Sequence, residues 1–486
     1  MFGAYSKPAA GGKRSAGGDA ATAGAGEPRV SDGYARALLA TLGYAADEIR
    51  SGPAEAHPAL AAAATGLMAL TGYAGVPPVA PPGHLAACAR GALAALRTLA
   101  GDHGDAPALA LVDGATLLGE RAAVLGLERR GTTSAGGYCR LVPARDGWLA
   151  INLPRADDLA MVPAWLEATP ATDPWPAIAG AVAGRRVRAL VARARLLGLA
   201  VAIAAPPPPA APPWCRLAAV GRRRVPPPAR PPFVVDLSAL WAGPLAGDLL
   251  ARAGARVVKV ESSRRPDGAR SGPAAFFDLL NGGKESVALD FAAAAGRSAL
   301  MALLARADIV IESSRPRAMH QLGIDPAALV RTRPGLTWIS ITAYGRRGAA
   351  GGWIGFGDDA AAAAGLAYAT GRRAGGTTPL FCGDAVADPL TGMHAAAAAL
   401  AAYRRGGGVL AALTLRDVAA HVLAFGPEPA AAAVRLLPGR RRAAAWEVVA
   451  DGVAAPILPP RARSAEWRAR PLGADTEAVL KEIHVR

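Results

Sequence analysis

Short apolar runs alternate with amphipathic segments through the second half of the chain. Runs at 233–240, 255–261, 307–313 and 336–345 have the length and composition of buried β-strands. The Ala- and Leu-rich segments between them predict helices, the first of which ends at Gly254. Strands joined by helical crossovers predict an α/β fold, a Rossmann-like parallel sheet covered by helices on both faces.

The first half has a different pattern. Helical periodicity comes first, and a hairpin pattern follows at 139–153 with its turn at Arg145-Asp146-Gly147. This half therefore predicts helical segments and a smaller α+β domain. The helices are expected over roughly 33–50, 58–70, 84–99 and 115–126.

Proline-rich sequence separates the two halves. Because such segments form stiff linkers, we expect a boundary there. The predicted organisation is a flexible N-terminal tail (1–30), a first unit with the small domain (31–204), a linker (205–232), a sheet domain (233–425) and a C-terminal strap and helix (426–486).

One segment is written twice. Residues 386–403 read VADPLTGMHAAAAALAAY and residues 79–96 read VAPPGHLAACARGALAAL; just upstream, 359–371 resembles 58–72. Where the second copy has Asp388, the first has Pro81. A carboxylate can act as a nucleophile and a proline cannot, so the repeat predicts one chemically competent copy for each chain.

Composition narrows the class of protein. The chain has 486 residues, 52% hydrophobic and 19% charged, which suits a globular protein with full cores. Its formal charge is +16, but the arginines are scattered and aromatic residues make up 5%, which argues against nucleic-acid binding. No long apolar run predicts a membrane span and no apolar signal region opens the chain. Four cysteines without a CxxC pair indicate neither a disulfide framework nor a metal site and favour the cytoplasm.

Asp388 precedes Pro389 at the start of an Ala-rich helix. The structural interpretation is a helix cap, Asp at the N-cap and Pro in the first turn. The chemical interpretation is a nucleophile kept ionised by the helix N-terminus. Asp384 is the rival carboxylate, Asp358 and Asp359 are expected to start a helix, and His394 is expected to be a packed residue.

The second half resembles the class III CoA-transferases, the CaiB/BaiF group that includes formyl-CoA and carnitine CoA-transferases. The matching pieces occur in order: VVDLSALWAGPLAGDLLARAGARVVKVE, FFDLLNGGKESVALDF, ADIVIESSRPRAMHQLGI, LTWISITAYGRRG and GDAVADPLTGMHAAAAALAAY. The resemblance implies a fold of that family and places its nucleophilic aspartate at Asp388. It implies that CoA moves from an acyl-CoA to a small carboxylate acceptor through a covalent aspartyl intermediate.

The resemblance also implies contacts with coenzyme A, which is a substrate here. They fall in three pieces, with Lys284 and Arg315 suited to its phosphate groups. A glycine-rich loop that closes the site in the family has its counterpart at Gly136 and Gly137. The expected contacts are Trp241, Ala242, Leu280, Asn281, Lys284, Ser313, Ser314 and Arg315.

Two other functions stay open from the sequence. The family's ENFRPG motif is ESSRPR here and the first half is degenerate, so a catalytically silent CoA-binding or assembly protein is one alternative. A racemase related to α-methylacyl-CoA racemases is the other, although Phe356 occupies the place of the second base, a histidine, and His57 matches that place only in the copy with Pro81. We expect a homodimer, or two halves that complete one another within one chain as subunits interlock in the family.

Overall fold

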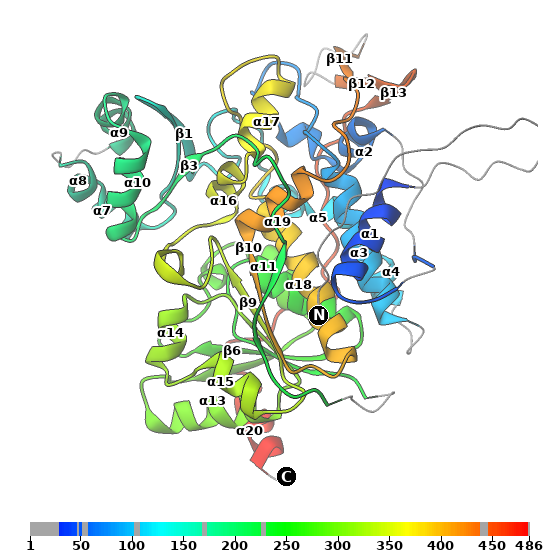
Figure 1. Ribbon diagram of the computed structural model, residues 1–486, viewed down its shortest axis with the longest axis vertical. Helices are drawn as coiled ribbons and strands as arrows, with labels where there is room; N and C mark the ends of the chain where they lie inside the picture. The colour runs from blue at the N-terminus through cyan, green and yellow to red at the C-terminus, as the bar shows by residue number, and fades with distance from the viewer. Residues whose placement is uncertain are drawn as a thin grey trace, which may run out of the picture.

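The computed structural model describes residues 29–45, 48–50, 57–101, 107–167, 173–224, 230–437 and 446–484. Its centre is a sheet in which seven described strands follow the order β4-β10-β9-β8-β5-β6-β7, all parallel except β4 (Figure 1). The predicted α/β class is confirmed. The strands are β4 (Cys215–Val220), β5 (Phe233–Asp236), β6 (Arg256–Ser262), β7 (Glu285–Leu289), β8 (Ile309–Glu312), β9 (Thr337–Thr342) and β10 (Val409–Thr414).

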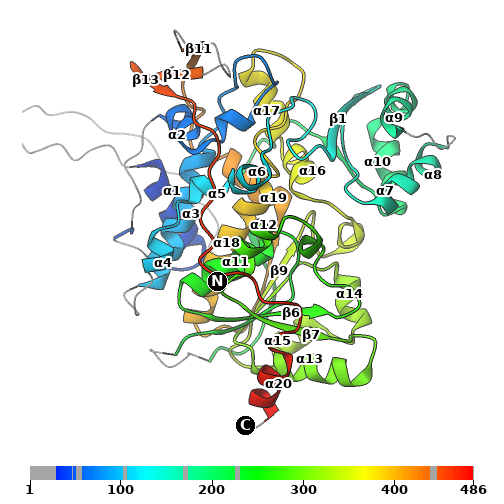
Figure 2. The ribbon, with the colours of Figure 1, turned by 180° about the vertical axis from the view of Figure 1, so that it is seen from behind.

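Helices of the second half cover both faces of this sheet, as crossover connections between parallel strands require. One face carries α13, α15 and the C-terminal α20, and the other carries α11 and α18 (Figures 1 and 2). The bounds are α11 (Ala242–Arg252), η2 (Gly268–Ser271), α12 (Ala274–Asn281), α13 (Ala294–Arg306), α14 (Pro316–Gln321), α15 (Pro326–Thr332), η3 (Gly348–Gly352), α16 (Gly357–Ala363), α17 (Leu366–Arg373), α18 (Ala387–Arg404), α19 (Leu415–Leu423) and α20 (Thr476–His484).

The helices of the first half pack beside α18. Three predicted helices differ from the structure. The helix α1 ends at Thr41, just before Gly43 with its positive φ of 79°. The segment 58–70 is divided at Gly66 into α2 and a short 3-10 helix, and the segment 115–126 is divided at Gly119. The bounds are α1 (Val30–Thr41), α2 (Pro58–Thr65), η1 (Met68–Leu70), α3 (Leu85–Ala100), α4 (Pro107–Ala110), α5 (Gly114–Leu117) and α6 (Glu120–Leu125). Of the predicted tail, residues 1–28 lie outside the described residues.

A smaller α+β unit projects to one side of the molecule (Figure 1). The predicted hairpin is present, with Ala144 paired to Gly147, and a third strand extends it into an antiparallel sheet with its own apolar core. Its elements are β1 (Cys139–Ala144), β2 (Gly147–Asn152), α7 (Ala156–Ala160), α8 (Val162–Leu166), α9 (Pro174–Ala183), α10 (Val187–Leu196) and β3 (Ala200–Ala204).

The predicted linker is more than a spacer. Within it, β4 pairs antiparallel with β10 and forms one edge of the central sheet. The proline-rich stretches flank this strand and leave its own backbone N–H groups free to pair, which is why a strand forms between them. Sequence reasoning weighted the prolines and missed the short run Cys215–Val220.

The two halves share one hydrophobic core. Leu38 and Leu93 of the first half belong to the same buried cluster as Leu245 and Leu390 of the second. The helix of each repeat copy, α3 and α18, contributes to this cluster and the two pack together. The repeated segments therefore meet face to face at the centre of the molecule.

Each half also crosses over the other. Gly66 (φ 84°) lies so close to the chain near Pro460 that an added Cβ would be 2.2 Å from its Cα. Gly365 (φ 99°), at the matching place of the second copy, approaches Pro207 in the same way, at 2.4 Å. Pro460 belongs to the segment that follows β11 (Ala433–Leu436), β12 (Trp446–Ala450) and β13 (Val453–Pro456) and runs down to α20 (Figure 2). The crossing is thus reciprocal: Gly66 of the first half is covered by the C-terminal segment, and Gly365 of the second half is covered by the proline-rich segment that joins the halves.

Candidate active site

Asp388 is the second residue of α18, and the residue as a whole is partly buried. The capping interpretation is wrong: the N-cap residue is Val386, and no side chain caps the helix. Across the described residues, no hydrogen bond reaches the Asp388 carboxylate. This carboxylate lies in the first turn of an 18-residue helix, whose dipole favours the ionised form. It makes no hydrogen bond that would give it a structural role.

Glycine makes room for the carboxylate. A Cβ on Gly357 would lie 2.2 Å from Oδ2 of Asp388 and 2.5 Å from the carbonyl oxygen of Ala385. The backbone N–H of Asp388 donates to that same carbonyl at 2.9 Å. Ala385 has a φ of 45°, which is uncommon for a residue with a side chain. The turn before α18 is therefore tight, and its strained backbone at Ala385 orients Asp388.

Two more carboxylates stand at the start of α16, as predicted. Asp358 accepts a hydrogen bond from the backbone N–H of Ala385 at 3.0 Å. Asp359 accepts from Tyr344 at 2.5 Å, from the backbone of Phe356 at 2.8 Å and from Asn152 at 3.0 Å. Asn152 lies at the end of β2 in the first half, so the small unit also contacts this cluster.

The rival carboxylate, Asp384, is already paired. It is fully buried and accepts two hydrogen bonds from Arg121, at 2.7 Å from Nε and 2.5 Å from an Nη. Arg121 lies on α6 of the first half and also stands over the ring of Trp241, 5.1 Å from its centroid. A carboxylate held in this way is a poor nucleophile.

The pKa values follow from this crowding. Burial raises the pKa of Asp388 to about 7; Arg121 lowers it and the three neighbouring carboxylates raise it further. Burial, then Asp384, raises the pKa of Asp358 to about 7, and burial raises that of Asp359 to about 6. Carboxyl groups of this kind exchange protons near neutral pH, which is typical of active sites.

His394 and His57 have structural roles. His394 is fully buried; its Nδ1 donates to the carbonyl of Leu390 and its Nε2 accepts from Tyr34, both at 2.7 Å. Burial lowers the pKa of His394 to about 3, so the ring is neutral. The expectation of a packed histidine is confirmed. His57 is the N-cap of α2, where its Nδ1 accepts from the backbone of Ala59.

Five of the eight residues expected to contact CoA lie near the carboxyl ends of the parallel strands, in the segments that follow β5 and β8. The strand order reverses between β5 and β8, and ligands of doubly wound sheets bind at the carboxyl ends of strands at such a point. Trp241 and Ala242 follow β5, and Ser313 to Arg315 follow β8. The two loops touch, since Ala239 donates its backbone N–H to Oγ of Ser313 at 3.0 Å.

Lys284 lies elsewhere than its predicted role requires. Its side chain is buried, and Nζ donates to Asp236 at 2.7 Å, to the carbonyl of Pro244 at 2.8 Å and to Asn281 at 3.1 Å. An ammonium group has three donors, so none is left for a phosphate. Leu280 and Asn281 are buried with it. The segment from Leu280 to Lys284 therefore stabilises the end of β5 and the start of α11 from the interior.

A cluster of arginines surrounds Arg315 instead. Arg315 is the N-cap residue of α14, and its side chain is exposed. Partial loss of hydration, followed by the positive charges of Arg317, Arg155 and Arg265, lowers the pKa of Arg315. Positive charges that act on one another in this way create a local potential that favours an anion. Arg155 follows β2 of the first half, pairs with Asp158 and stands 5.9 Å from the ring centroid of Phe356. Sequence reasoning missed Arg155 and Arg265 because they come from distant segments.

The glycine loop lies beside the ion pair. A Cβ on Gly136 would be 3.3 Å from an Nη of Arg121 and 3.9 Å from Oδ1 of Asp384. Gly137 has a φ of 83°, and a Cβ there would be 2.8 Å from an Nη of Arg130. The predicted loop is therefore next to the carboxylate cluster, at a place where side chains would collide with arginine.

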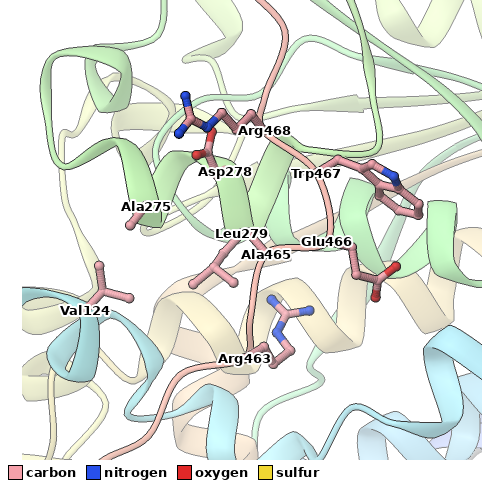
Figure 3. Close-up of a pocket in the computed structure, with 9 residues that line it drawn as sticks. All are labelled: Val124, Ala275, Asp278, Leu279, Arg463, Ala465, Glu466, Trp467 and Arg468. Atoms are coloured by element: carbon pink, nitrogen blue, oxygen red, sulfur yellow. The ribbon is translucent and has the colours of Figure 1, made fainter.

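A cavity of about 320 Å³ lies under the C-terminal segment where it passes over α12 (Figure 3). Asp388 does not line it. The lining residues are Val124, Ala275, Asp278, Leu279, Arg463, Ala465, Glu466, Trp467 and Arg468.

Within the described part of the chain, no helix is long and apolar enough to span a bilayer.

Comparison with known proteins matches the second half of the chain. The model of CoA-transferase family III matches residues 233–442. A succinate–glutarate CoA-transferase from Agrobacterium fabrum is 33% identical over 208 residues, which are 39% of this chain and 52% of the relative. An acyl-CoA transferase from Fusarium pseudograminearum is 33% identical over 184 residues, 35% of this chain and 40% of that protein.

A solved structure of a hypothetical protein from Mycobacterium tuberculosis is 32% identical, with a TM-score of 0.36, over 41% of this chain and 56% of that one. The chain thus spans about half the length of the curated relatives it matches. The matched residues include the sheet from β5 to β10, the arginine loop after β8 and the whole of α18. Residues 233–442 of this chain are therefore similar to CoA-transferase family III.

Proposed function

We propose that the protein is a CoA-transferase in which Asp388 is the nucleophile. One observation carries the proposal: among the four aspartates clustered in the family region, Asp388 is the least buried residue, and its carboxylate accepts no hydrogen bond from the described residues. Asp384 is paired with Arg121. Asp358 accepts a hydrogen bond from Ala385 in the turn before α18, and Asp359 accepts one from Phe356 at the start of α16.

The chemistry is a double acyl exchange. A carboxylate oxygen of Asp388 attacks the thioester carbonyl of the donor, and the C–S bond breaks to release the CoA thiolate and leave a mixed anhydride. The thiolate then attacks the Asp388 acyl carbon, which frees the donor acid and leaves an aspartyl-CoA thioester. An acceptor carboxylate attacks that thioester to form a second anhydride, and the thiolate takes the new acyl group and restores Asp388.

The CoA moiety is proposed to bind at the point where the strand order reverses. Its phosphate groups would be held by Arg315 and its neighbours Arg317 and Arg265, with Arg155 contributed by the first half. Guanidinium groups suit phosphate oxygens, and several together raise the local concentration of an anionic substrate. Ser313 and Trp241, from the two touching loops, would contact the remainder of the CoA moiety.

We further propose that the two halves act as an intrachain pseudo-dimer with one acylation site. The shared core, the reciprocal crossing at Gly66 and Gly365 and the pairing of Arg121 with Asp384 support this arrangement. Pro81 of the first copy supplies no carboxylate, and α3 begins only at Leu85. The cytoplasm fits these substrates as the site of action.

The test is an exchange assay with succinyl-CoA and acetyl-CoA as donors and glutarate and oxalate as acceptors, the acids that appear in the names of relatives. We expect transfer by the native chain and a loss of at least 1,000-fold in Asp388→Asn, because a covalent route has no substitute. Asp358→Asn is the matched control and should keep measurable transfer. If thioesters bind but nothing is exchanged, the protein is a silent CoA-binding protein.

A second candidate function is α-proton exchange on an acyl-CoA. Asp358, beside Asp388 and with a pKa raised to about 7 by burial, is a carboxyl group that could stand in for the absent histidine. The measurement is incorporation of solvent deuterium at the α-carbon of a 2-methylacyl-CoA. Deuterium incorporation that is lost in both Asp358→Asn and Asp388→Asn would favour this function over CoA transfer.

A further inference from the structure

The turn that carries Asp388 is held from outside its own half. Gly383, Asp384 and Ala385 form this turn, and each is fixed by one hydrogen-bonding partner. Gly383 donates its backbone N–H to Oγ1 of Thr71 at 3.2 Å, and Asp384 is paired with Arg121. Thr71 and Arg121 both belong to the first half, so two of these three contacts cross between the halves.

Arg121 has the more central position of the two. Its guanidinium lies between the buried carboxylate of Asp384, the ring of Trp241 and the backbone of Gly136. Burial alone would lower the pKa of Arg121, but the charge and hydrogen bonds of Asp384 outweigh it and raise that pKa. Arg121 is therefore a permanent positive charge inside a cluster of carboxyl groups.

Charged groups face Asp388 from several elements. Asp358 and Asp359 come from α16, Asp384 from the turn before α18 and Arg121 from α6; the carboxylates raise the pKa of Asp388 and Arg121 lowers it. Arg121 donates one hydrogen bond to each oxygen of Asp384, so this ion pair also fixes the turn. One guanidinium thus acts on both the position and the charge of Asp388.

We propose that Arg121 is a positioning residue by which the first half keeps Asp388 aimed and ionised. The inference rests on the proposed function, since it assigns the degenerate half a task in that same site. The first half lacks a nucleophile of its own and supplies the cation that the carboxylate cluster of the other half needs.

The test compares Arg121→Met and Arg121→Lys with the native chain by the pH dependence of kcat/KM. An attacking carboxylate must be ionised, so rates rise as pH passes through its pKa. Without the guanidinium the pKa rises, and the acidic limb should move up by about one unit, with a roughly tenfold loss of rate below that limb. Arg121→Lys keeps the charge and should restore the limb while a lower kcat remains.

Two control variants separate position from charge. Thr71→Val removes a contact to the turn without changing charge, so it should lower kcat and leave the limb in place. Arg90→Met removes another bidentate ion pair of the first half, the one between Arg90 and Asp113. These residues are far along the chain from the carboxylate cluster. It should change stability and leave the pH profile unchanged.

A second readout does not need activity. Titration of carbon-13-labelled aspartate carboxyl groups by NMR, with Asp388→Asn used for assignment, should show the Asp388 pKa about one unit higher in Arg121→Met. If Arg121→Met fails to fold, the double variant Arg121→Gln/Asp384→Asn leaves no buried charge unpaired and should shift the same signal upward, by less.

The outcomes are distinct. A parent protein without transfer contradicts the proposed function. A parent that transfers CoA, with an Arg121→Met variant that loses kcat equally at every pH and leaves the Asp388 titration unchanged, overturns the inference alone and makes Arg121 a stabilising residue only. An unshifted titration in the double variant overturns it as well.

Discussion

Replacing Gly66 by alanine tests the reciprocal crossing of the two halves. Gly66 ends α2 in the left-handed region, and its missing side chain is what lets the C-terminal segment pass: an added Cβ would be 2.2 Å from Cα and 2.4 Å from N of Pro460. Since both are backbone atoms of a proline, they cannot turn aside as a flexible side chain could. The segment from Pro459 to Arg463 would have to lift from the first half.

The magnitude has two parts. Alanine in the left-handed region costs about 1–2 kcal/mol, and forcing an extra carbon into a packed interior costs about 1–3 kcal/mol more. Gly126 provides the matched control, because it ends α6 at a φ of 60° and an added Cβ would meet nothing within 4 Å. Gly126→Ala should show the first part alone, so the difference between the variants measures the crossing.

The assay is thermal unfolding combined with limited trypsin digestion. We expect Gly66→Ala to unfold at lower temperature than Gly126→Ala and to be cut faster after Arg461 and Arg463. Arg463 is protected in the native chain because it pairs with Glu120 and Asp248 at 2.7 and 2.8 Å. Equal unfolding temperatures and equal cleavage for the two variants would refute the crossing.

Three further predictions follow from the site and the sheet. Asp388→Asn should raise the unfolding temperature at pH 8 and leave it nearly unchanged at pH 4. Folding raises the pKa of Asp388 from 3.8 to about 7, so the native state gains stability below pH 4 that is lost as the pH rises through 7. The loss is at most about 4 kcal/mol, and asparagine, which does not ionise, removes it. Arg315→Ala should raise KM for acyl-CoA about 10-fold with little change in kcat, and added salt should weaken acyl-CoA binding less in this variant than in the native chain, as measured by steady-state kinetics at two ionic strengths. A fragment that starts at Pro231 should aggregate, as measured by light scattering, because it loses the edge strand β4 and the apolar face that covers α18; stable monomers of this fragment would contradict the shared core.

Much of the fold could be predicted from the sequence because its signals are local. The apolar run at β6 and the glycine after α11 lie within a few residues of the predicted bounds. The edge strand β4 was missed because pairing with β10, a long-range event, decides its structure. The prediction that Asp388 caps its helix is wrong for a similar reason: Asp358 and Asp384 set the turn at Ala385, and the helix begins two residues earlier than its proline suggests.

The site was predictable only where a motif stands in one segment. Asp388 could be found from its own neighbours in the sequence, whereas Arg121 and Asn152 belong to the degenerate half and carry no motif. Lys284 shows the opposite error: a lysine in a matching motif suggests a phosphate ligand, but in this chain it forms a buried pair with Asp236. Whether a charge faces solvent or an ion-pair partner is decided by packing, which periodicity does not show.

Trapping the acyl-enzyme tests the central claim most directly. The native chain is incubated with acyl-CoA, treated with hydroxylamine or borohydride, digested and analysed by mass spectrometry. The account predicts one modified residue for each chain, Asp388, with unmodified peptides around Pro81 and Asp384. Turnover without any adduct at Asp388, or full CoA exchange by Asp388→Ala, would contradict it.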